Sequence, residues 1–393
     1  MKKTYSKKHI NFACYITMFL LGLYLAGYQN VIDSVTKEYS IASSIMGLII
    51  ALHFIGSITA PVIFGELSDR KGRKVVIVIA FLVLTGGLLL ASIFRNIYIL
   101  ALGIFLIGSG FAVIEGTLST VLSDINPGET VRVINLSQMY LCIGAVLGPL
   151  AALFVINQFG SWRALFTLLV FMFFLMALVF TRFDLDGVKD GEGRKETIHI
   201  KSEEKIHSLA LLKRKNFLLL CLSMFLYVGV EEGIAFWTTT FFGNAYSNPI
   251  WGTYSLSAYW AGMIIGRFLA GVFPKKALTF LSVGAFLSSV SIISASLINS
   301  KELGFVCFFL TGLGLSVIWP VIVSITSDKF VKYRGTAVGI MMSMGAMGGT
   351  VMPFLIGVFD HFGGIRVAFL SLSVLIFVTL LAVLKSDKLE FHI

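Results

Sequence analysis

Residues 65–74 read GELSDRKGRK and separate two apolar stretches, 41–65 and 75–94. Each stretch is long enough to cross about 30 Å of hydrocarbon as a helix. Gly72 lies where the chain must reverse direction, and glycine tolerates the backbone conformations of tight turns. Asp69, at the end of the first stretch, can pair with arginines at the water boundary. The alternative is an ordinary basic loop. We expect a gating loop made of Gly65, Asp69, Arg70, Gly72 and Arg73.

The composition of the chain indicates that lipid is the solvent for much of its surface. Of 393 residues, 57% are hydrophobic and only 13% are charged, whereas soluble proteins carry about 25% charged residues. The charges are also clustered, with long uncharged stretches between them. The four cysteines each lie in an apolar stretch without a CxxC pair, so we expect neither a disulfide nor a bound metal.

Twelve stretches are long enough to span the membrane as helices. The first follows a short basic start without a small-residue cleavage site, so we interpret it as a retained helix rather than a signal peptide. An even count places both chain ends on the same side. We predict an N-terminal six-helix bundle over 1–181, a linker over 182–215 and a C-terminal six-helix bundle over 216–393. The predicted spans are 11–32, 41–65, 75–94, 97–122, 132–157, 162–181, 216–243, 251–273, 277–298, 303–327, 335–359 and 365–385.

The two halves are related by an internal repeat of nearly constant offset. A parallel repeat of six spans is the pattern of transporters in which the solute binds between two halves. Matching segments recur 203 to 206 positions later: Gly108-Ser109-Gly110, Ser123-Asp124 and Pro149 as Gly312-Leu313-Gly314, Ser327-Asp328 and Pro353; Phe159-Gly160, Arg163 and Phe166 as Phe362-Gly363, Arg366 and Phe369; Gly56 and Gly65 as Gly262 and Gly271.

The distribution of basic residues predicts the orientation and excludes nucleic-acid binding. The formal charge is +10, but 25 of the 31 Lys and Arg residues lie in the N-terminal segment, the C-terminal segment and every second loop, against five in the alternate loops. This is the positive-inside pattern. We therefore expect a multi-pass protein of the cell membrane with both termini in the cytoplasm.

The charged loop and several spans resemble a known family. Residues 65–74 resemble the loop signature of the major facilitator superfamily, a glycine followed by D-R-x-G-R. Other segments resemble its fucose–galactose–glucose:proton symporter and sodium-dependent glucose carrier branch. They are Tyr227-Val228-Gly229-Val230-Glu231 with Trp237, Trp260-Ala261-Gly262 with Gly266-Arg267, Asn135-Leu136-Ser137-Gln138 with Gly148-Pro149, and Gly312-x-Gly314 with Trp319-Pro320 and Arg334-Gly335-Thr336-Ala337.

This resemblance implies a secondary active transporter with two pseudo-symmetric six-helix bundles. It implies uptake of a small polar solute, a sugar or related metabolite, by alternating access with H⁺ or, as an alternative, Na⁺. Glu115 stands where the branch carries a protonatable glutamate in its fourth span, and Asp33 is a loose match to an acidic residue of the first. Ser119 departs from the asparagine common four residues after that glutamate. We expect no cofactor, no partner beyond the solute and the lipid bilayer, and a monomer.

Glu115, Glu231, Glu232 and Arg267 are the clear cases of a charge well inside a predicted span, where it is costly and therefore a functional candidate. Glu115 lies among apolar residues and can bind and release a proton; the alternative is a hydrogen-bonded helix contact. Glu231 and Glu232 are neighbours, about 100° apart around a helix, so they cannot face the same way. Glu231 is the candidate for solute or cation, and Glu232 for a contact with a neighbouring helix. Arg267 needs an acidic partner or the solute.

Uncharged polar and aromatic residues supply candidate solute contacts. Asn135 and Gln138 carry amides that both donate to and accept from hydroxyl groups. Trp237 and Trp319 offer indole faces that can stack on a sugar ring, although packing is the usual role of such a residue. His53 is either an interior histidine or a proton-binding group.

Two other function classes fit the sequence less well. A proton-driven exporter of drugs or metabolites is the alternative transporter, but the fourth-span arginine common in exporters would fall at Ile104. An enzyme is not expected, since no HExxH, no GxSxG and no nucleotide-binding GxxxxGK[ST] occurs. A membrane sensor without transport activity stays open.

Overall fold

The computed structural model describes residues 7–127, 129–183, 185, 211, 213–272, 277–330 and 334–388. Most of the predicted linker lies outside these residues. The first half consists of α1 (Lys7–Tyr39), α2 (Ser43–Lys71), α3 (Arg73–Ile93), α4 (Ile97–Ile125), α5 (Thr130–Phe159) and α6 (Arg163–Thr181). The second half consists of α8 (Lys215–Tyr246), α9 (Pro249–Val272), α10 (Ala277–Leu297), α11 (Lys301–Leu315), α12 (Ile318–Lys329), α13 (Arg334–Gly363) and α14 (Ile365–Lys388).

Eleven helical stretches in the described part of the chain are long and apolar enough to cross a membrane. One of them, 301–326, combines α11 and α12 around a short break. The remaining predicted span, 251–273, corresponds to α9, which is 24 residues long, or about 36 Å of helix. It carries several Trp, Tyr and Ser residues and Arg267. The prediction of an all-α membrane protein is confirmed, and α9 contacts α5 of the first half.

The outer surface of both bundles is apolar, as lipid requires. Large side chains such as Phe171 and Phe286 are each 68% exposed, and similar residues cover α3, α6, α10 and α14. Inside the bundles, many of the buried polar side chains are Ser or Thr, and several of these donate to a carbonyl of their own helix, as Thr17 does to Ala13. Between helices, the turns follow local rules: Gly72 has a φ of 86° just before α3, and Asn96 caps α4 by accepting hydrogen bonds from the Tyr98 and Ile99 amides.

Close helix contacts repeat from one half to the other, in agreement with the sequence repeat. At three pairs of equivalent positions a glycine lies against a backbone carbonyl of a neighbouring helix, so that a Cβ there would collide with the oxygen. Small residues permit this approach between membrane helices. The pairs are Gly56 on Phe105 and Gly262 on Phe309, Gly108 on His53 and Gly312 on Tyr259, and Gly144 on Phe19 and Gly348 on Phe225.

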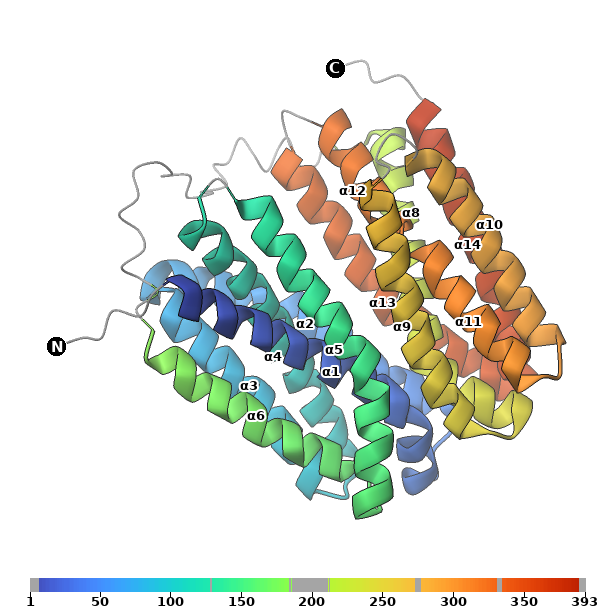
Figure 1. Cartoon of the computed structure of the whole chain (residues 1–393), viewed down its shortest axis with the longest axis horizontal. Helices are drawn as coiled ribbons and strands as arrows, with labels where there is room; N and C mark the ends of the chain where they lie inside the picture. Colours follow the sequence, from blue (N-terminus) through green and yellow to red (C-terminus); the bar gives the residue numbers. More distant parts are fainter. Residues whose placement is uncertain are drawn as a thin grey trace.

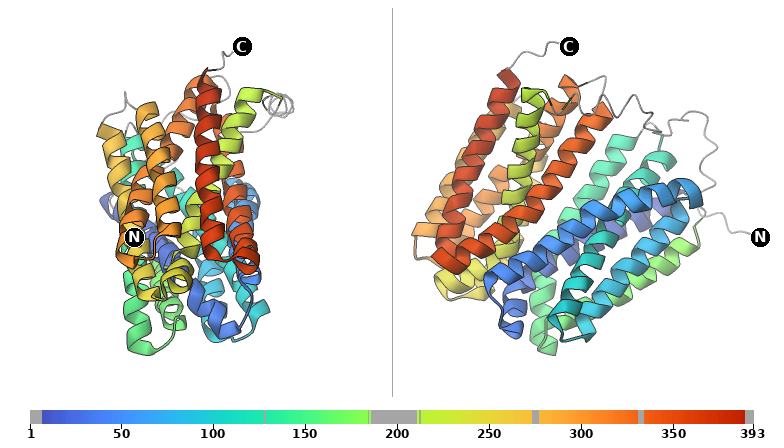
Figure 2. Two further views of the ribbon diagram at one scale, coloured as in Figure 1. Left: turned by 90° about the vertical axis from the view of Figure 1, so that its right-hand side faces the viewer. Right: turned by 180° about the vertical axis from the view of Figure 1, so that it is seen from behind.

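The two bundles lie side by side and approach each other most closely at one end. Contacts between them run along α2 and α13, α5 and α9, and α1 and α8 (Figure 1). On α2, Ser43 donates a hydrogen bond to Asp360 of α13, and Phe54 lies against Gly349 near the middle of the same pair. Toward the ends that carry the chain termini, the helices of the two halves diverge (Figure 2).

Candidate functional site

A hydrogen-bonded bridge joins the two halves near the middle of the molecule. The fully buried Gln29 of α1 donates from its amide nitrogen to a carboxylate oxygen of Glu232 on α8, at 3.1 Å. Its amide oxygen accepts a hydrogen bond from the Trp260 indole nitrogen on α9, also at 3.1 Å. One side chain of the first half is therefore held by two of the second, and the halves cannot part here without breaking both bonds.

A buried ion pair lies next to this bridge. Glu231 of α8 lies 3.3 Å from the guanidinium of Arg267 on α9, and the two side chains are 10% and 33% exposed. The other terminal nitrogen of Arg267 donates to the Cys142 sulfur on α5, at 3.2 Å, which makes a second link between the halves. Because Glu231 and Glu232 are adjacent in α8, they point to different partners, as helix geometry predicts.

A separate polar pair lies within the first half. Gln138 of α5 donates to the carboxylate of Glu115 on α4 at 3.2 Å. Among the salt bridges between described residues, none involves Glu115. Asn135 lies one helical turn before Gln138 and is exposed. A carboxyl inside a span, with an amide partner and no cation partner among the described residues, can take up a proton without breaking an ion pair.

Other predicted residues lie apart from these pairs. Trp237 is fully buried in α8 and donates to the Pro353 carbonyl at 2.9 Å, so its indole is engaged in helix packing. Trp319 is 37% exposed on α12. Asp33, near the end of α1, pairs with Lys37 at 2.7 Å. His53 is buried in α2 among aromatic rings.

The gating loop is described only in part. Gly72 adopts the positive φ of 86° that the tight turn was expected to require. Arg73 forms an ion pair with Asp124 at the end of α4, which ties the loop to a third helix. The surroundings of Gly65 and the side chains of Asp69 and Arg70 lie outside the described part of the structure, so the predicted pairing of Asp69 stays a prediction.

Sequence reasoning missed Gln29, Trp260 as a polar contact, and Cys142. Gln29 is an amide within an apolar stretch, the same signal that drew attention to Gln138, but it precedes no recognised motif. Trp260 was noted only as part of a resemblance, and Cys142 was interpreted as a small core residue. Within the described ranges, no three His, Cys, Asp or Glu residues are grouped so that they could hold a metal ion.

The polar cluster between two pseudo-equivalent bundles can bind a solute with several hydrogen-bonding groups and can carry charge. Comparison with known proteins fits this arrangement. The chain is 23% identical to a glucose/mannose transporter of Bacillus subtilis over 87% of this chain and 86% of that protein. It is 24% identical to a putative glucose/galactose transporter of Helicobacter pylori over 74% of each. These relatives are transporters, in agreement with the prediction that the chain is not an enzyme.

Solved structures share the fold over nearly the whole chain. A bacterial homologue of the human lysosomal transporter Spinster, in an inward-facing and unoccupied conformation, superposes with a TM-score of 0.81 at 14% identity and covers 98% of both chains. The Escherichia coli fucose:proton symporter superposes with a TM-score of 0.63 at 16% identity, over 95% of this chain and 98% of that one. The sequence profile of the Major Facilitator Superfamily matches residues 12–304 and 275–390, and the chain belongs to that family.

Proposed function

We propose that the protein takes up a sugar or a closely related polyhydroxy metabolite across the cell membrane by alternating access, coupled to H⁺. The observation that carries the proposal is the bridge in which Gln29 of the first half is bound by Glu232 and Trp260 of the second. A solute that supplies hydroxyl groups at this point can replace those bonds. It then changes the relative stability of the bridged and separated halves, as a transport cycle requires.

The chemistry of the surrounding side chains supports a sugar as the solute. Amides and carboxylates bind hydroxyl groups from both sides of the bridge, and the Trp260 ring offers an apolar face. The relatives named glucose/mannose and glucose/galactose transporters support the same class. A hydrophobic drug that separated the bridge would leave these polar groups without partners, which costs about 1–3 kcal/mol for each.

The Glu115–Gln138 pair supports proton coupling. Glu115 lies inside a span, and its hydrogen-bond partner is neutral. Gln138 can donate to the ionised carboxylate, and after an amide rotation its oxygen can accept from the protonated acid, so both forms keep a partner. Glu231, in contrast, already has the cation Arg267 beside it. We therefore assign proton binding to Glu115 and solute contact to the Glu231, Glu232 and Arg267 group.

The arrangement of the halves supports alternating access. The halves touch along α2 and α13 from Ser43 to Phe54, and they diverge toward the chain termini (Figure 2). With both termini in the cytoplasm, as the charge distribution predicts, this conformation is open toward the inside. Outward opening requires the Ser43–Asp360 contact and the Gln29 bridge to separate.

The test is uptake into proteoliposomes that contain the purified protein. We expect an inward proton gradient to drive accumulation of at least one of D-glucose, D-mannose, D-galactose and L-fucose. Glu115→Gln should abolish accumulation but retain sugar exchange without a gradient. Glu302→Gln, the same change at a carboxylate that is 60% exposed, serves as the control and should transport normally.

Three results would contradict parts of this proposal. If the Glu115→Gln variant accumulates sugar along a proton gradient at the rate of the unmodified protein, Glu115 does not couple transport to protons. If accumulation depends on a sodium gradient and does not change with pH, the coupled cation is Na⁺ and not H⁺. Failure to bind or move any of the four sugars, in protein that remains folded, overturns the sugar class itself.

A further inference from the structure

Three polar side chains of α1 and α2 lie buried against one another in the first half. Tyr24, Tyr28 and His53 are 0%, 1% and 2% exposed. The Tyr24 ring lies 6.0 Å from both the Tyr28 ring and the His53 ring, and Tyr28 lies 6.3 Å from His53, measured between centroids. We refer to these three residues as the Tyr–His cluster.

The polar atoms of the Tyr–His cluster have no hydrogen-bond partner within the described part of the chain. This holds for both tyrosine hydroxyls and for both ring nitrogens of His53. A buried polar group without a partner destabilises a fold by about 1–3 kcal/mol. Four such atoms in one cluster therefore lower the stability of the fold substantially, and they point to a ligand that pairs with them.

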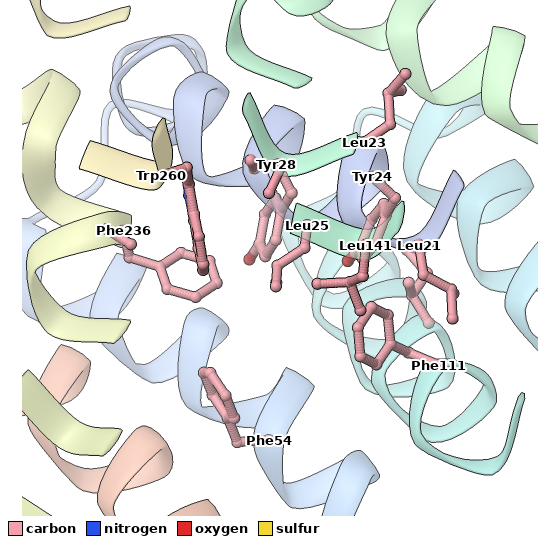
Figure 3. Close-up of a cluster of buried hydrophobic side chains, with 14 of the residues drawn as sticks. Leu21, Leu23, Tyr24, Leu25, Tyr28, Phe54, Phe111, Leu141, Phe236 and Trp260 are labelled. Carbon is pink, nitrogen blue, oxygen red and sulfur yellow. The ribbon is translucent and has the colours of Figure 1, made fainter. Parts of the chain in front are cut away.

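Aromatic rings from both halves surround this cluster. Phe54 lies 5.4 Å from His53, and Phe236 of α8 lies 5.4 Å from Tyr28 and 5.9 Å from Phe54. Figure 3 shows the Tyr28 hydroxyl on the side of its ring that faces Phe236 and Trp260, with Phe54 beyond Phe236. Aromatic faces next to hydrogen-bonding groups match a sugar ring, which has C–H faces and a rim of hydroxyls.

We propose that the Tyr–His cluster is a hydroxyl-binding subsite for the sugar, an inference that rests on the proposed function. The two hydroxyls both donate and accept, and a neutral His53 supplies one donor and one acceptor. The hydroxyl groups of a sugar supply both the donors and the acceptors that these four atoms lack. The subsite continues into the bridge through Trp260, whose indole nitrogen donates to Gln29.

A polyol accounts for the cluster better than a proton does. Protonation of His53 would leave both tyrosine hydroxyls unpaired, and none of the rings around it is an anion. The ionisable groups that face His53 are Tyr24 and Tyr28 of α1; the contacts from α2 and α4 are Phe54 and Phe111. Glu115 lies one turn beyond Phe111 on α4, and Glu232 one turn before Phe236 on α8.

Phe236 closes this subsite in the present conformation. It belongs to the second half, is fully buried and contacts both Tyr28 and Phe54 of the first half. When the halves move apart at this level, Phe236 withdraws and the unpaired hydroxyls become accessible. Sugar binding thus favours the conformation in which the α1–α8 contact is open.

The test uses Tyr24→Phe and Tyr28→Phe, which remove only the hydroxyl groups. Because these hydroxyls are buried without partners, each variant should raise the midpoint of thermal unfolding of the sugar-free protein by about 2 °C. Each should also raise the Kd for D-glucose, measured by tryptophan fluorescence or calorimetry, about tenfold. Tyr246→Phe is the matched control, since its hydroxyl donates to the Ala295 carbonyl; it should lower the midpoint and leave the Kd unchanged.

The outcomes separate this proposal from the one it rests on. If the unmodified protein binds none of the sugars of the uptake panel, the proposed function fails and the subsite fails with it. If the protein binds D-glucose and both variants bind it equally well, only the subsite is overturned. The subsite is also overturned if His53→Gln changes only the pH dependence of uptake while both tyrosine variants keep the normal Kd. In that case the cluster is a proton site.

Discussion

The ion pair between Glu231 and Arg267 offers a sharp test of how burial sets the strength of a charge pair in this protein. Replacing Glu231 by Gln keeps the shape of the side chain but leaves Arg267 without its anion. The pair can be compared with Asp33–Lys37, in which the nitrogen and the carboxylate oxygen are 2.7 Å apart, against 3.3 Å for Glu231 and Arg267. Distance alone therefore predicts that the Asp33 pair is the stronger.

Exposure reverses that order. At an effective dielectric of about 20, a separation of 3.3 Å gives roughly 5 kcal/mol of attraction and 2.7 Å roughly 6 kcal/mol. Lys37, however, is 65% exposed, and exposed pairs contribute only about 0.2–1 kcal/mol. Loss of one partner from a buried pair costs about 3–5 kcal/mol, which the one-third exposure of Arg267 reduces to about 2–3 kcal/mol.

Thermal unfolding of purified variants measures this difference. We expect Glu231→Gln to lower the midpoint by about 3–5 °C and Lys37→Gln by less than about 1 °C. The double variant Glu231→Gln with Arg267→Gln should recover about half of the loss, because no unpaired charge remains. Equal effects of Glu231→Gln and Lys37→Gln, or strict additivity in the double variant, would refute the reasoning.

Two further predictions concern the gate and the helix contacts. Asp69→Asn should slow sugar uptake several-fold while leaving the Kd for sugar unchanged, since Asp69 lies in the predicted gating loop; a variant altered only in equilibrium affinity would contradict that role. Gly108→Ala places a Cβ against the His53 carbonyl and should destabilise the protein by about 1–3 kcal/mol. Gly116→Ala, on the same helix with open space around the added Cβ, should instead stabilise it by about 0.5–1 kcal/mol in the same unfolding assay.

The sequence predicts the fold well because lipid restricts it so strongly. Long uncharged stretches can only be membrane helices, since every backbone polar group must be paired within the segment. The repeat offset that linked Gly108 to Gly312 in sequence reappears as identical glycine–carbonyl contacts in the two halves. Arg163 and Arg366 likewise each bind backbone carbonyls of neighbouring helices, at equivalent ends.

The candidate site was predictable only in part. Charged residues inside spans are conspicuous, so Glu115, Glu231, Glu232 and Arg267 can be identified without a structure. Their partners cannot be, because a helix of known sequence can still rotate about its axis and choose among several neighbours. The Trp237 indole, which the sequence offers as a surface for a sugar ring, donates to the Pro353 carbonyl, whereas Trp260 lies at the bridge.

By itself, the sequence determined that this protein consists of two related bundles of membrane helices, because apolar length, loop charge and repeat offset are properties of the chain alone. Only the tertiary structure decided that Gln29 bonds with Glu232 and Trp260, and that Tyr24, Tyr28 and His53 share one buried place. Those contacts join residues up to 231 positions apart, and they depend on how helices pack and rotate. No local pattern encodes that choice, since it is made by the combined packing of both halves.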